Sequence, residues 1–386
     1  MALKVLIIPD KLKGTLTAAA AAKAIARGWR KARAGDSLSL LPMSDGGDGF
    51  GEVTSALLKA RIQRVRTVDA AHRPCVARWW WEPKTRTAII ESAGVIGLAM
   101  LPPERFHPFQ LDTLGLGAVV RAAAERGARR CLIGIGGSAT NDGAFGLALA
   151  LGWEFLDRKG ELIEQWTGLG RLERIRPPRR RRWFKDVVVA TDVGNRLLGQ
   201  QGATRVYGPQ KGLRPEDFAL AERCLGRLAR VAKAQFGHDF AQAPGAGAAG
   251  GLGFGLLAFL GAELQPGFEL FAKQSALERR LRAADLVVTG EGAIDRSTLM
   301  GKGVGQLAQN CRKQKIPCIA LAGIVGDSLG TGAWYMQVHA LTELTTTAQA
   351  KAKPAYWLER LAQRVATCVH ENPARTNSSP PDLKSP

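Results

Sequence analysis

The chain has 386 residues, 46% of them apolar and 23% charged, which excludes a largely disordered protein and predicts a globular one of about two or three domains. Its formal net charge of +20 favours anionic partners, such as nucleic acid, acidic lipid or a small phosphorylated or carboxylated ligand. The six cysteines form no C-x-x-C pair and the N-terminus lacks a signal-peptide pattern, so we expect a reduced, cytoplasmic protein.

The N-terminal part predicts an alternation of strands and helices. An apolar run over residues 3–9 has the length of a strand, and the alanine-rich residues 18–34 predict a helix. Residues 37–42 predict a second strand, which is followed by the loop SDGGDG and by a helix that ends near Lys59. This alternation is typical of parallel α/β architecture.

The same pattern returns near the C-terminus, with strands over 284–290 and 316–323 and helices over 303–314 and 354–369. The middle of the chain differs, because its strand-like runs are short. An uncharged stretch over 241–262 is long enough to cross a bilayer, but its glycines and proline favour a glycine-rich loop that leads into a buried helix.

We therefore expect an α/β protein with two α/β domains. Residues 1–68 and 276–370 would form a discontinuous Rossmann-like domain, whose parallel sheet is built from both chain ends. Residues 69–275 would form an inserted second domain. The polar, proline-rich residues 372–386 predict a disordered tail.

Five glycine-rich segments combine glycine with a carboxylate, a lysine or an amide, and at least three of them follow a predicted strand. In open α/β sheets, such loops supply backbone N–H groups for phosphate and carboxylates for metal at the carboxyl ends of strands. Together they predict a phosphate-handling site. The segments are PDKLKGT (9–15), PMSDGGDG (42–49), GIGGSATNDG (134–143), VYGPQKG (206–212) and GEGAIDRSTLMGKG (290–303).

Other readings of these residues remain open. GIGGSA at 134–139 matches a dinucleotide-binding pattern, which would indicate an oxidoreductase, although an acid in the first turn of the following helix would repel a pyrophosphate. The arginine-rich run 174–185 favours a solvated surface loop and, as an alternative, a polyanion contact. Five scattered histidines argue against zinc, whereas aspartates beside glycines suit Mg²⁺. No Walker A loop or protein-kinase motif set is present.

In order and spelling, these segments resemble the bacterial type-1 glycerate kinase family. The similarity runs from residue 3 to about residue 370 and is carried above all by GGSATNDG, YGPQKG and GAGAAGGLG, with PDKLKGTL, MSDGGDGF, TDVGNRLLG and GEGAIDRSTLMGKGV in support. The resemblance implies an ATP- and Mg²⁺-dependent kinase that phosphorylates D-glycerate on the 2-hydroxyl. It also implies one Rossmann-like and one second α/β domain.

The chain departs from the family's spelling at several positions, among them Lys11 for serine, Asp48 for glutamate and Arg196 for proline. These departures leave open a kinase of another small hydroxy acid, or one that phosphorylates the 3-hydroxyl. A dinucleotide-dependent oxidoreductase and a polyanion-binding protein are the alternatives from other classes. Expected partners are D-glycerate and ATP, without membrane or nucleic acid, and a homodimer is compatible with the sequence.

For such a kinase we expect Asp192, at the end of the apolar strand VVVATD, to orient the hydroxyl and accept its proton, with Lys211 as a second catalytic residue. The alternative for Asp192 is a helix or turn cap. The remaining expected site residues are grouped by the ligand that each would bind. They are Lys13, Ser138, Thr140 and Asn141 for the substrate, Gly290, Gly292, Asp295, Lys302 and Gly303 for the nucleotide, and Asp45 and Asp142 for the metal.

Overall fold

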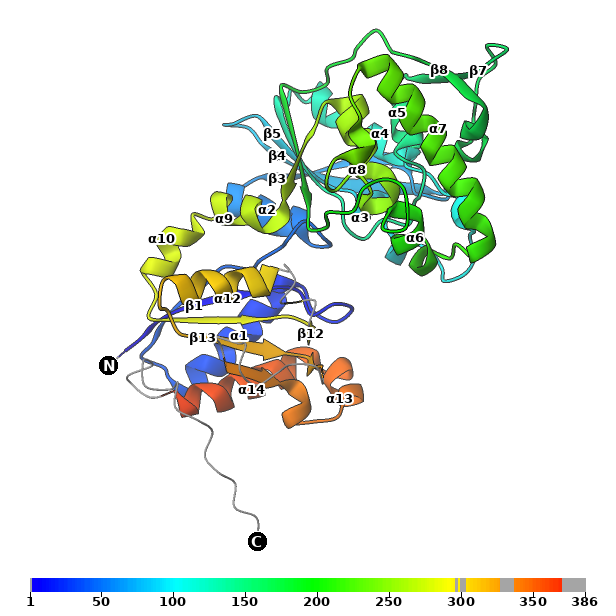
Figure 1. Ribbon diagram of the computed structural model, residues 1–386. Coiled ribbons are helices and arrows are strands. Elements are labelled where there is room, and N and C mark those ends of the chain that lie inside the picture. The colour runs from blue at the N-terminus through cyan, green and yellow to red at the C-terminus, as the bar shows by residue number, and fades with distance from the viewer. Residues whose placement is uncertain (1, 296–297, 299–302, 327–336, 370–386) are drawn as a thin grey trace. The chain divides into compact units, whose positions relative to one another are not determined.

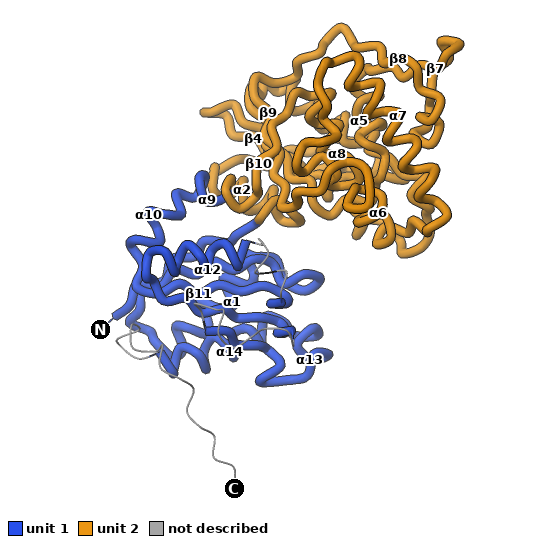
Figure 2. Tube along the Cα trace, in the orientation of Figure 1, with its two compact units in different colours: residues 1–44, 271–386 blue, residues 45–270 orange. Residues whose placement is uncertain are grey.

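The structure is a computed structural model, and it describes residues 2–295, 298, 303–326 and 337–369 (Figure 1). The predicted tail over 372–386 and Lys302 therefore lie outside the described residues. The chain divides into two compact units, coloured in Figure 2. Unit 1 comprises residues 1–44 and 271–386, and unit 2 comprises residues 45–270.

Unit 1 contains a five-stranded sheet in the order β15-β13-β11-β1-β2, with every neighbouring pair parallel. Both chain ends supply its strands, as the sequence predicts. Central β1 pairs with β11 from the C-terminal part, in the register Val5 to Leu286. The strands are β1 Lys4–Pro9, β2 Ser37–Leu40, β11 Leu286–Gly290, β13 Cys318–Ala322 and β15 Gln337–Ala340.

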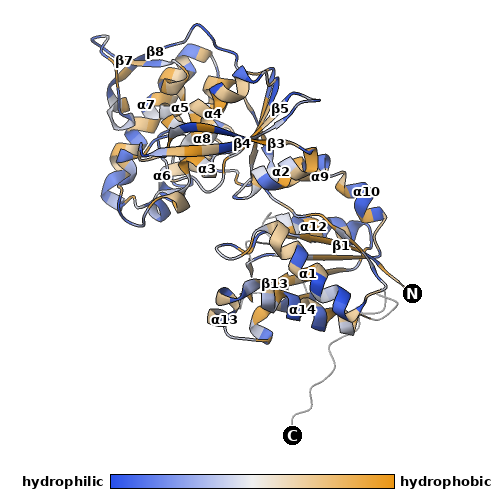
Figure 3. Cartoon of the chain, turned by 180° about the vertical axis from the view of Figure 1, so that it is seen from behind, coloured by the Kyte–Doolittle hydropathy of each residue, from blue (hydrophilic) through white to orange (hydrophobic). Residues whose placement is uncertain are grey.

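Helices cover both faces of this sheet, because β1-α1-β2 and β11-α12-β13 are crossovers that lead in opposite directions along it. Helix α1 (Ala18–Ala32) packs against α14 (Pro354–Cys368), and α12 (Gly303–Lys313) lies on the other face (Figure 1). Gly28 permits the α1–α14 contact, since a Cβ atom there would lie 2.0 Å from the Glu359 carbonyl oxygen. In Figure 3, β1 is mostly hydrophobic after its first residue, whereas α14 carries both kinds of residue.

The remaining elements of unit 1 are short. Helix α9 carries the chain from unit 2 into unit 1. Among the described residues, the other short elements of unit 1 are the helices α10 and α13, the 3-10 turn η7 and the ladder of β12 with β14. Their bounds are α9 Gly267–Gln274, α10 Leu277–Arg282, β12 Ala293–Ile294, β14 Ile324–Val325, η7 Leu341–Glu343 and α13 Thr347–Ala352.

Unit 2 contains a six-stranded mixed sheet in the order β10-β9-β6-β5-β4-β3. The first four strands are parallel, and β4 and β3 continue the sheet antiparallel. A separate antiparallel ladder joins β7 to β8. The strands are β3 Arg61–Val68, β4 Pro74–Glu82, β5 Thr87–Glu91, β6 Arg130–Gly134, β7 Glu154–Asp157, β8 Leu172–Arg176, β9 Asp186–Thr191 and β10 Glu263–Pro266.

Residues 45–68 belong to unit 2 by their contacts, whereas we expected residues 1–68 in the first domain. The reason is physical: β3 pairs along its whole length with β4, and α2 packs on β4 and β5. As a division into domains that fold separately, the expected boundaries stay a prediction.

Helices and 3-10 turns surround the sheet of unit 2. The Trp79 to Trp81 triplet on β4 is buried, with alternate rings in two different core clusters, because successive side chains of a strand point to opposite faces of the sheet. The helical elements are α2 Phe50–Leu58, α3 Ala93–Ile96, η1 Leu98–Met100, η2 Pro108–Gln110, α4 Leu114–Glu125, α5 Phe145–Ala150, η3 Trp166–Arg171, α6 Ala203–Tyr207, η4 Pro209–Lys211, η5 Pro215–Asp217, α7 Phe218–Phe236, η6 Phe240–Gln242 and α8 Ala248–Leu260.

The uncharged stretch over 241–262 forms the predicted glycine-rich loop and buried helix, α8, whose Phe254 and Phe259 lie in the core. Among the described residues, no helix has the length and apolar character needed to cross a membrane. The run Arg179 to Arg182 is exposed after β8, as expected for a surface loop. Part of it binds its own loop, since the Arg182 side chain donates to the carbonyl oxygen of Lys185.

Candidate active site

Three predicted loops meet at the carboxyl edge of the unit 2 sheet. Strands β6 and β9 are parallel neighbours, so the segments that follow them, 134–143 and 191–202, leave the sheet at the same edge. The loop over 45–49 lies against both, because Gly136 N donates to the Gly46 carbonyl oxygen at 3.2 Å. Gly46 has a positive φ, and a Cβ atom there would lie 2.9 Å from the Ala190 carbonyl oxygen.

A fourth segment, 245–251, locks two of these loops together. Gly247 N donates to the Asn195 carbonyl oxygen at 2.8 Å, and Gly143 N donates to the Gly250 carbonyl oxygen at 3.1 Å. A Cβ atom at Gly250 would lie 1.9 Å from the Thr140 carbonyl oxygen. The glycines of GAGAAGG therefore serve close packing of backbone against backbone.

The glycines of GIGGSA have the same kind of role. A Cβ atom at Gly134 would collide with the Phe50 ring, and one at Gly137 would lie 2.2 Å from Asp48 Oδ1. Both glycines thus pack against side chains of the protein itself. The structure therefore gives no support to the oxidoreductase alternative.

The predicted substrate residues Ser138, Thr140 and Asn141 are buried in the loop after β6. The Ser138 and Thr140 hydroxyls lie 2.9 Å apart, and Asn141 Nδ2 donates to Thr204 Oγ1 at 3.1 Å. Asn141 Oδ1 has no hydrogen-bond partner within the described part of the chain. The polar side chains of this loop are therefore mostly hydrogen-bonded within the protein, and the side-chain oxygen of Asn141 is the exception.

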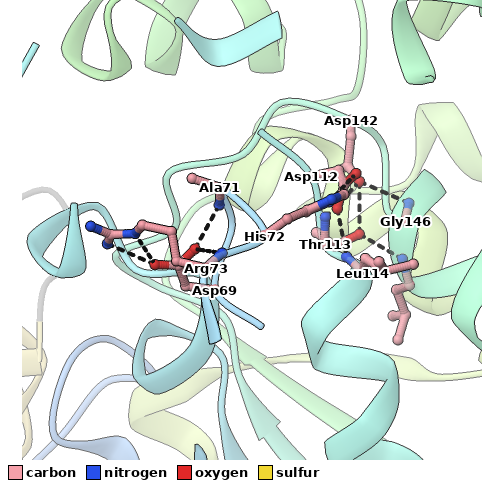
Figure 4. A network of polar contacts seen from close by, with 10 residues as sticks. Asp69, Ala71, His72, Arg73, Asp112, Thr113, Leu114, Asp142 and Gly146 are labelled. Atoms are coloured by element: carbon pink, nitrogen blue, oxygen red, sulfur yellow. Dashed lines mark hydrogen bonds and ion pairs between the residues drawn. The ribbon is translucent and has the colours of Figure 1, made fainter. Parts of the chain in front are cut away.

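Asp142, a predicted metal ligand, is fully buried beside the first turns of α4 and α5. Its Oδ2 accepts hydrogen bonds from Thr113 N, Thr113 Oγ1 and Gly146 N at 2.9, 2.7 and 3.0 Å (Figure 4). Burial, together with the charge of Asp112, raises the pKa of Asp142 to about 6. Through Oδ2 this carboxylate ties the starts of α4 and α5 to the loop, whereas its Oδ1 has no partner in the described structure.

Lys211 is also buried, with 6% of its surface exposed, and its Nζ donates to the Thr140 carbonyl oxygen at 2.7 Å. Burial lowers the pKa of Lys211 to about 7, and the nearby Asp142 carboxylate opposes this shift. The Lys211 ammonium group thus contacts the backbone of the loop after β6.

Asp192 follows β9 directly and is exposed at the edge where the loops meet. Tyr207 lies close to Asp192. The half-burial of Tyr207, and next the charge of Asp192, raise the pKa of Tyr207 to about 12. The Tyr207 hydroxyl donates to Asn195 Oδ1 at 2.5 Å. The sequence analysis did not single out Tyr207, although it lies in the VYGPQKG segment.

Glu91 is a second residue that the sequence analysis missed. It ends β5, and its two carboxylate oxygens accept from Gly49 N and Gly51 N at 2.9 and 2.8 Å. Burial raises the pKa of Glu91. A carboxylate at the end of the strand-like run TAIIES was the available signal, and its role here is to fix the start of α2 beside the 45–49 loop.

The predicted nucleotide residues that the structure describes belong to unit 1, with Gly290 at the end of β11 and Gly292 just beyond it. Asp10 N donates to the Gly290 carbonyl oxygen at 2.8 Å, and a Cβ atom at Gly292 would lie 3.0 Å from Lys13 N. Lys13, expected to bind substrate, is therefore exposed next to the nucleotide residues of its own unit. Asp295 stands at the end of β12, and its carbonyl oxygen accepts from Thr298 N at 3.0 Å. Gly303 begins α12.

The chain matches the glycerate kinase family over residues 5–370. It is 35% identical over 375 residues to a glycerate kinase of Bacillus subtilis, covering 95% of this chain and 98% of that one. It is 37% identical over 331 residues to the glycerate 2-kinase of Escherichia coli, covering 85% and 87%. A crystal structure described as a putative glycerate kinase 2 from Salmonella typhimurium LT2 superposes with a TM-score of 0.78 at 33% identity, covering 95% of this chain and 98% of that one.

These matches establish that the protein is a phosphotransferase, a kinase with two α/β units. The chain belongs to the glycerate kinase family, which confirms the resemblance found in its sequence. Membership implies glycerate as substrate and an ATP-like phosphate donor.

Proposed function

We propose that the protein transfers the γ-phosphoryl group of ATP to the 2-hydroxyl of D-glycerate, giving 2-phosphoglycerate and ADP. The name of the Escherichia coli relative supports the choice of the 2-hydroxyl. The observation that carries the proposal is the meeting of three loops at one sheet edge, with exposed Asp192 beside the buried 138–142 loop. A homodimer stays a prediction.

In the proposed reaction the glycerate hydroxyl oxygen bonds to the γ-phosphorus while the bond to the bridging oxygen breaks and ADP leaves. Asp192 orients the hydroxyl and takes its proton as the new bond forms. The substrate carboxylate would meet donors from Ser138, Thr140 and Asn141. Lys211 would contribute by holding the Thr140 carbonyl and so the loop. ATP would bind the unit 1 residues Gly290, Gly292, Asp295, Lys302 and Gly303, with Lys13 beside them.

A magnesium ion would arrive with ATP rather than occupy a ready-made protein site. Among the residues that the structure describes, no group of three or more acidic, histidine or cysteine side chains forms a ready-made metal site. Mg²⁺ at kinase sites commonly needs only one or two carboxylates besides phosphate and water. The candidate ligands are Asp45 and Oδ1 of Asp142, and this Oδ1 has no hydrogen-bond partner among the residues that the structure describes. When bound, the ion would neutralise charge on the transferred phosphoryl group.

The proposal predicts ADP release that depends on both D-glycerate and a divalent ion. In a coupled assay with ATP and Mg²⁺, D-glycerate should be turned over with a higher kcat/KM than L-glycerate, glycolate or D-lactate. Excess EDTA should reduce the rate to background, and Mn²⁺ should restore it. A higher kcat/KM for another acid of the panel would favour the alternative of a different hydroxy-acid kinase. Full activity in EDTA would refute the metal requirement.

A further inference from the structure

One short segment contacts both loops on which the proposed chemistry depends. Residues 203–211 consist of α6 followed by η4, and we call them the clamp segment. Thr204 Oγ1 accepts a hydrogen bond from Asn141 Nδ2 at 3.1 Å, and Lys211 Nζ donates to the Thr140 carbonyl oxygen at 2.7 Å. Tyr207 Oη donates to Asn195 Oδ1 at 2.5 Å. The first two bonds hold the loop after β6, and the third holds the loop after β9.

The three residues lie close together in the chain, which explains how one segment can do this. Thr204 and Tyr207 belong to α6, and Lys211 ends η4. Thr204 is fully buried and Lys211 nearly so. A buried hydroxyl or ammonium group is stable only when it is hydrogen-bonded, and the partners here belong to the loops themselves. The clamp segment is therefore built to face the two loops.

Asn195 is held at three points, which makes the loop after β9 rigid near Asp192. Besides the bond from Tyr207, its Nδ2 donates to the Gln201 carbonyl oxygen at 2.7 Å, and its own carbonyl oxygen accepts from Gly247 N at 2.8 Å. The bond from Tyr207 is the one that ties this loop to the clamp segment. Half-burial, and next the charge of Asp192, raise the pKa of Tyr207 to about 12, so its hydroxyl stays protonated and can donate across the neutral pH range.

We propose that Tyr207 is a positioning residue for Asp192, and that the clamp segment sets the distance between the substrate loop and the proton-accepting carboxylate. Tyr207 acts through Asn195 and the loop after β9. The inference rests on the proposed function, because it needs Asp192 to act on the substrate hydroxyl.

The test is a double-mutant cycle between Tyr207→Phe and Asp192→Asn. Tyr207→Phe keeps the ring and removes only the hydroxyl, so we expect kcat to fall about 10-fold or more, with KM for ATP unchanged and the melting temperature nearly so. In the Asp192→Asn background the same substitution should have little further effect on kcat, because the group that Tyr207 positions is already lost. Tyr356→Phe, at an exposed position of α14 in unit 1, is the matched control and should leave kcat unchanged.

Each result of this experiment either supports the inference or contradicts it. Losses in kcat that multiply in the double variant would overturn the inference, since they would mean that Tyr207 acts independently of Asp192. A Tyr207→Phe enzyme with wild-type kcat would overturn it as well. If Tyr207→Phe does not fold, Asn195→Ser removes the acceptor from the other side of the bond and replaces it in the cycle. A wild-type protein without activity on D-glycerate would instead refute the proposed function, so the two failures remain distinguishable.

Discussion

Replacing Asp192 with asparagine should lower kcat by about 10²–10⁴-fold and change KM for D-glycerate little. The substitution keeps the size of the side chain and one acceptor oxygen but removes the charge that would accept the hydroxyl proton. The expected loss corresponds to roughly 3–5 kcal/mol of transition-state stabilisation, far more than loss of an exposed cap would cost. Steady-state kinetics with D-glycerate varied at saturating ATP measure it.

Asp186→Asn is the matched control, because Asp186 is also exposed on β9 but stands at the opposite end of the strand. It should leave kcat unchanged. A role of Asp192 as a cap predicts a lower melting temperature with kcat intact, and a role as a metal ligand predicts a defect that added Mg²⁺ partly rescues. If kcat of Asp192→Asn stays within about threefold of the wild type, Asp192 is not the proton acceptor.

Gly250→Ala should destabilise the protein by roughly 2–5 kcal/mol. Gly250 has a φ of +70°, which is strained for alanine, and the new Cβ atom would lie 1.9 Å from the Thr140 carbonyl oxygen, where only a backbone shift could relieve the clash. Because that shift would move the substrate loop, kcat/KM for D-glycerate should fall as well. Urea unfolding and steady-state kinetics measure the two effects.

Gly261→Ala tests the effect of backbone strain alone, without a steric clash of the new Cβ atom. Gly261 ends the same helix, α8, with a φ of +64°, but a Cβ atom there would meet nothing within 4 Å. Its substitution should cost only about 1–2 kcal/mol of backbone strain and leave activity intact. Equal destabilisation by both substitutions would show that the contact between Gly250 and Thr140 does not constrain the loop.

Much of the fold could be predicted because its signals are local. The apolar runs before Pro9 and Gly290 have strand length, and the shared sheet of unit 1 follows from parallel pairing of those two strands. The placement of residues 45–68 could not be predicted in the same way. Strand β3 (residues 61–68) pairs antiparallel with β4 in the sheet of unit 2. That pairing depends on contacts that the sequence of β3 alone does not encode.

The candidate site shows the same division between local and tertiary information. Glycine-rich segments after strands could be located from the sequence, and the site residues expected on them stay a prediction. The burial of Asp142 and Lys211, and the bonds that occupy Asp142 Oδ2 and Lys211 Nζ, come from α4, α5 and the loop backbone, which the local sequence does not reveal. Tyr207 and Glu91 were missed for the same reason, since their partners lie on other segments.

The most direct test of the proposed function is NMR of the product formed from ATP, Mg²⁺ and D-glycerate by the wild-type protein. Phosphorylation of the 2-hydroxyl places phosphorus beside a carbon that bears one hydrogen, so the proton-coupled ³¹P signal of the product should be a doublet that correlates with the C2 proton. A triplet that correlates with the C3 methylene protons would contradict the assignment to the 2-hydroxyl, and the absence of any glycerate-dependent product would contradict the proposed function itself.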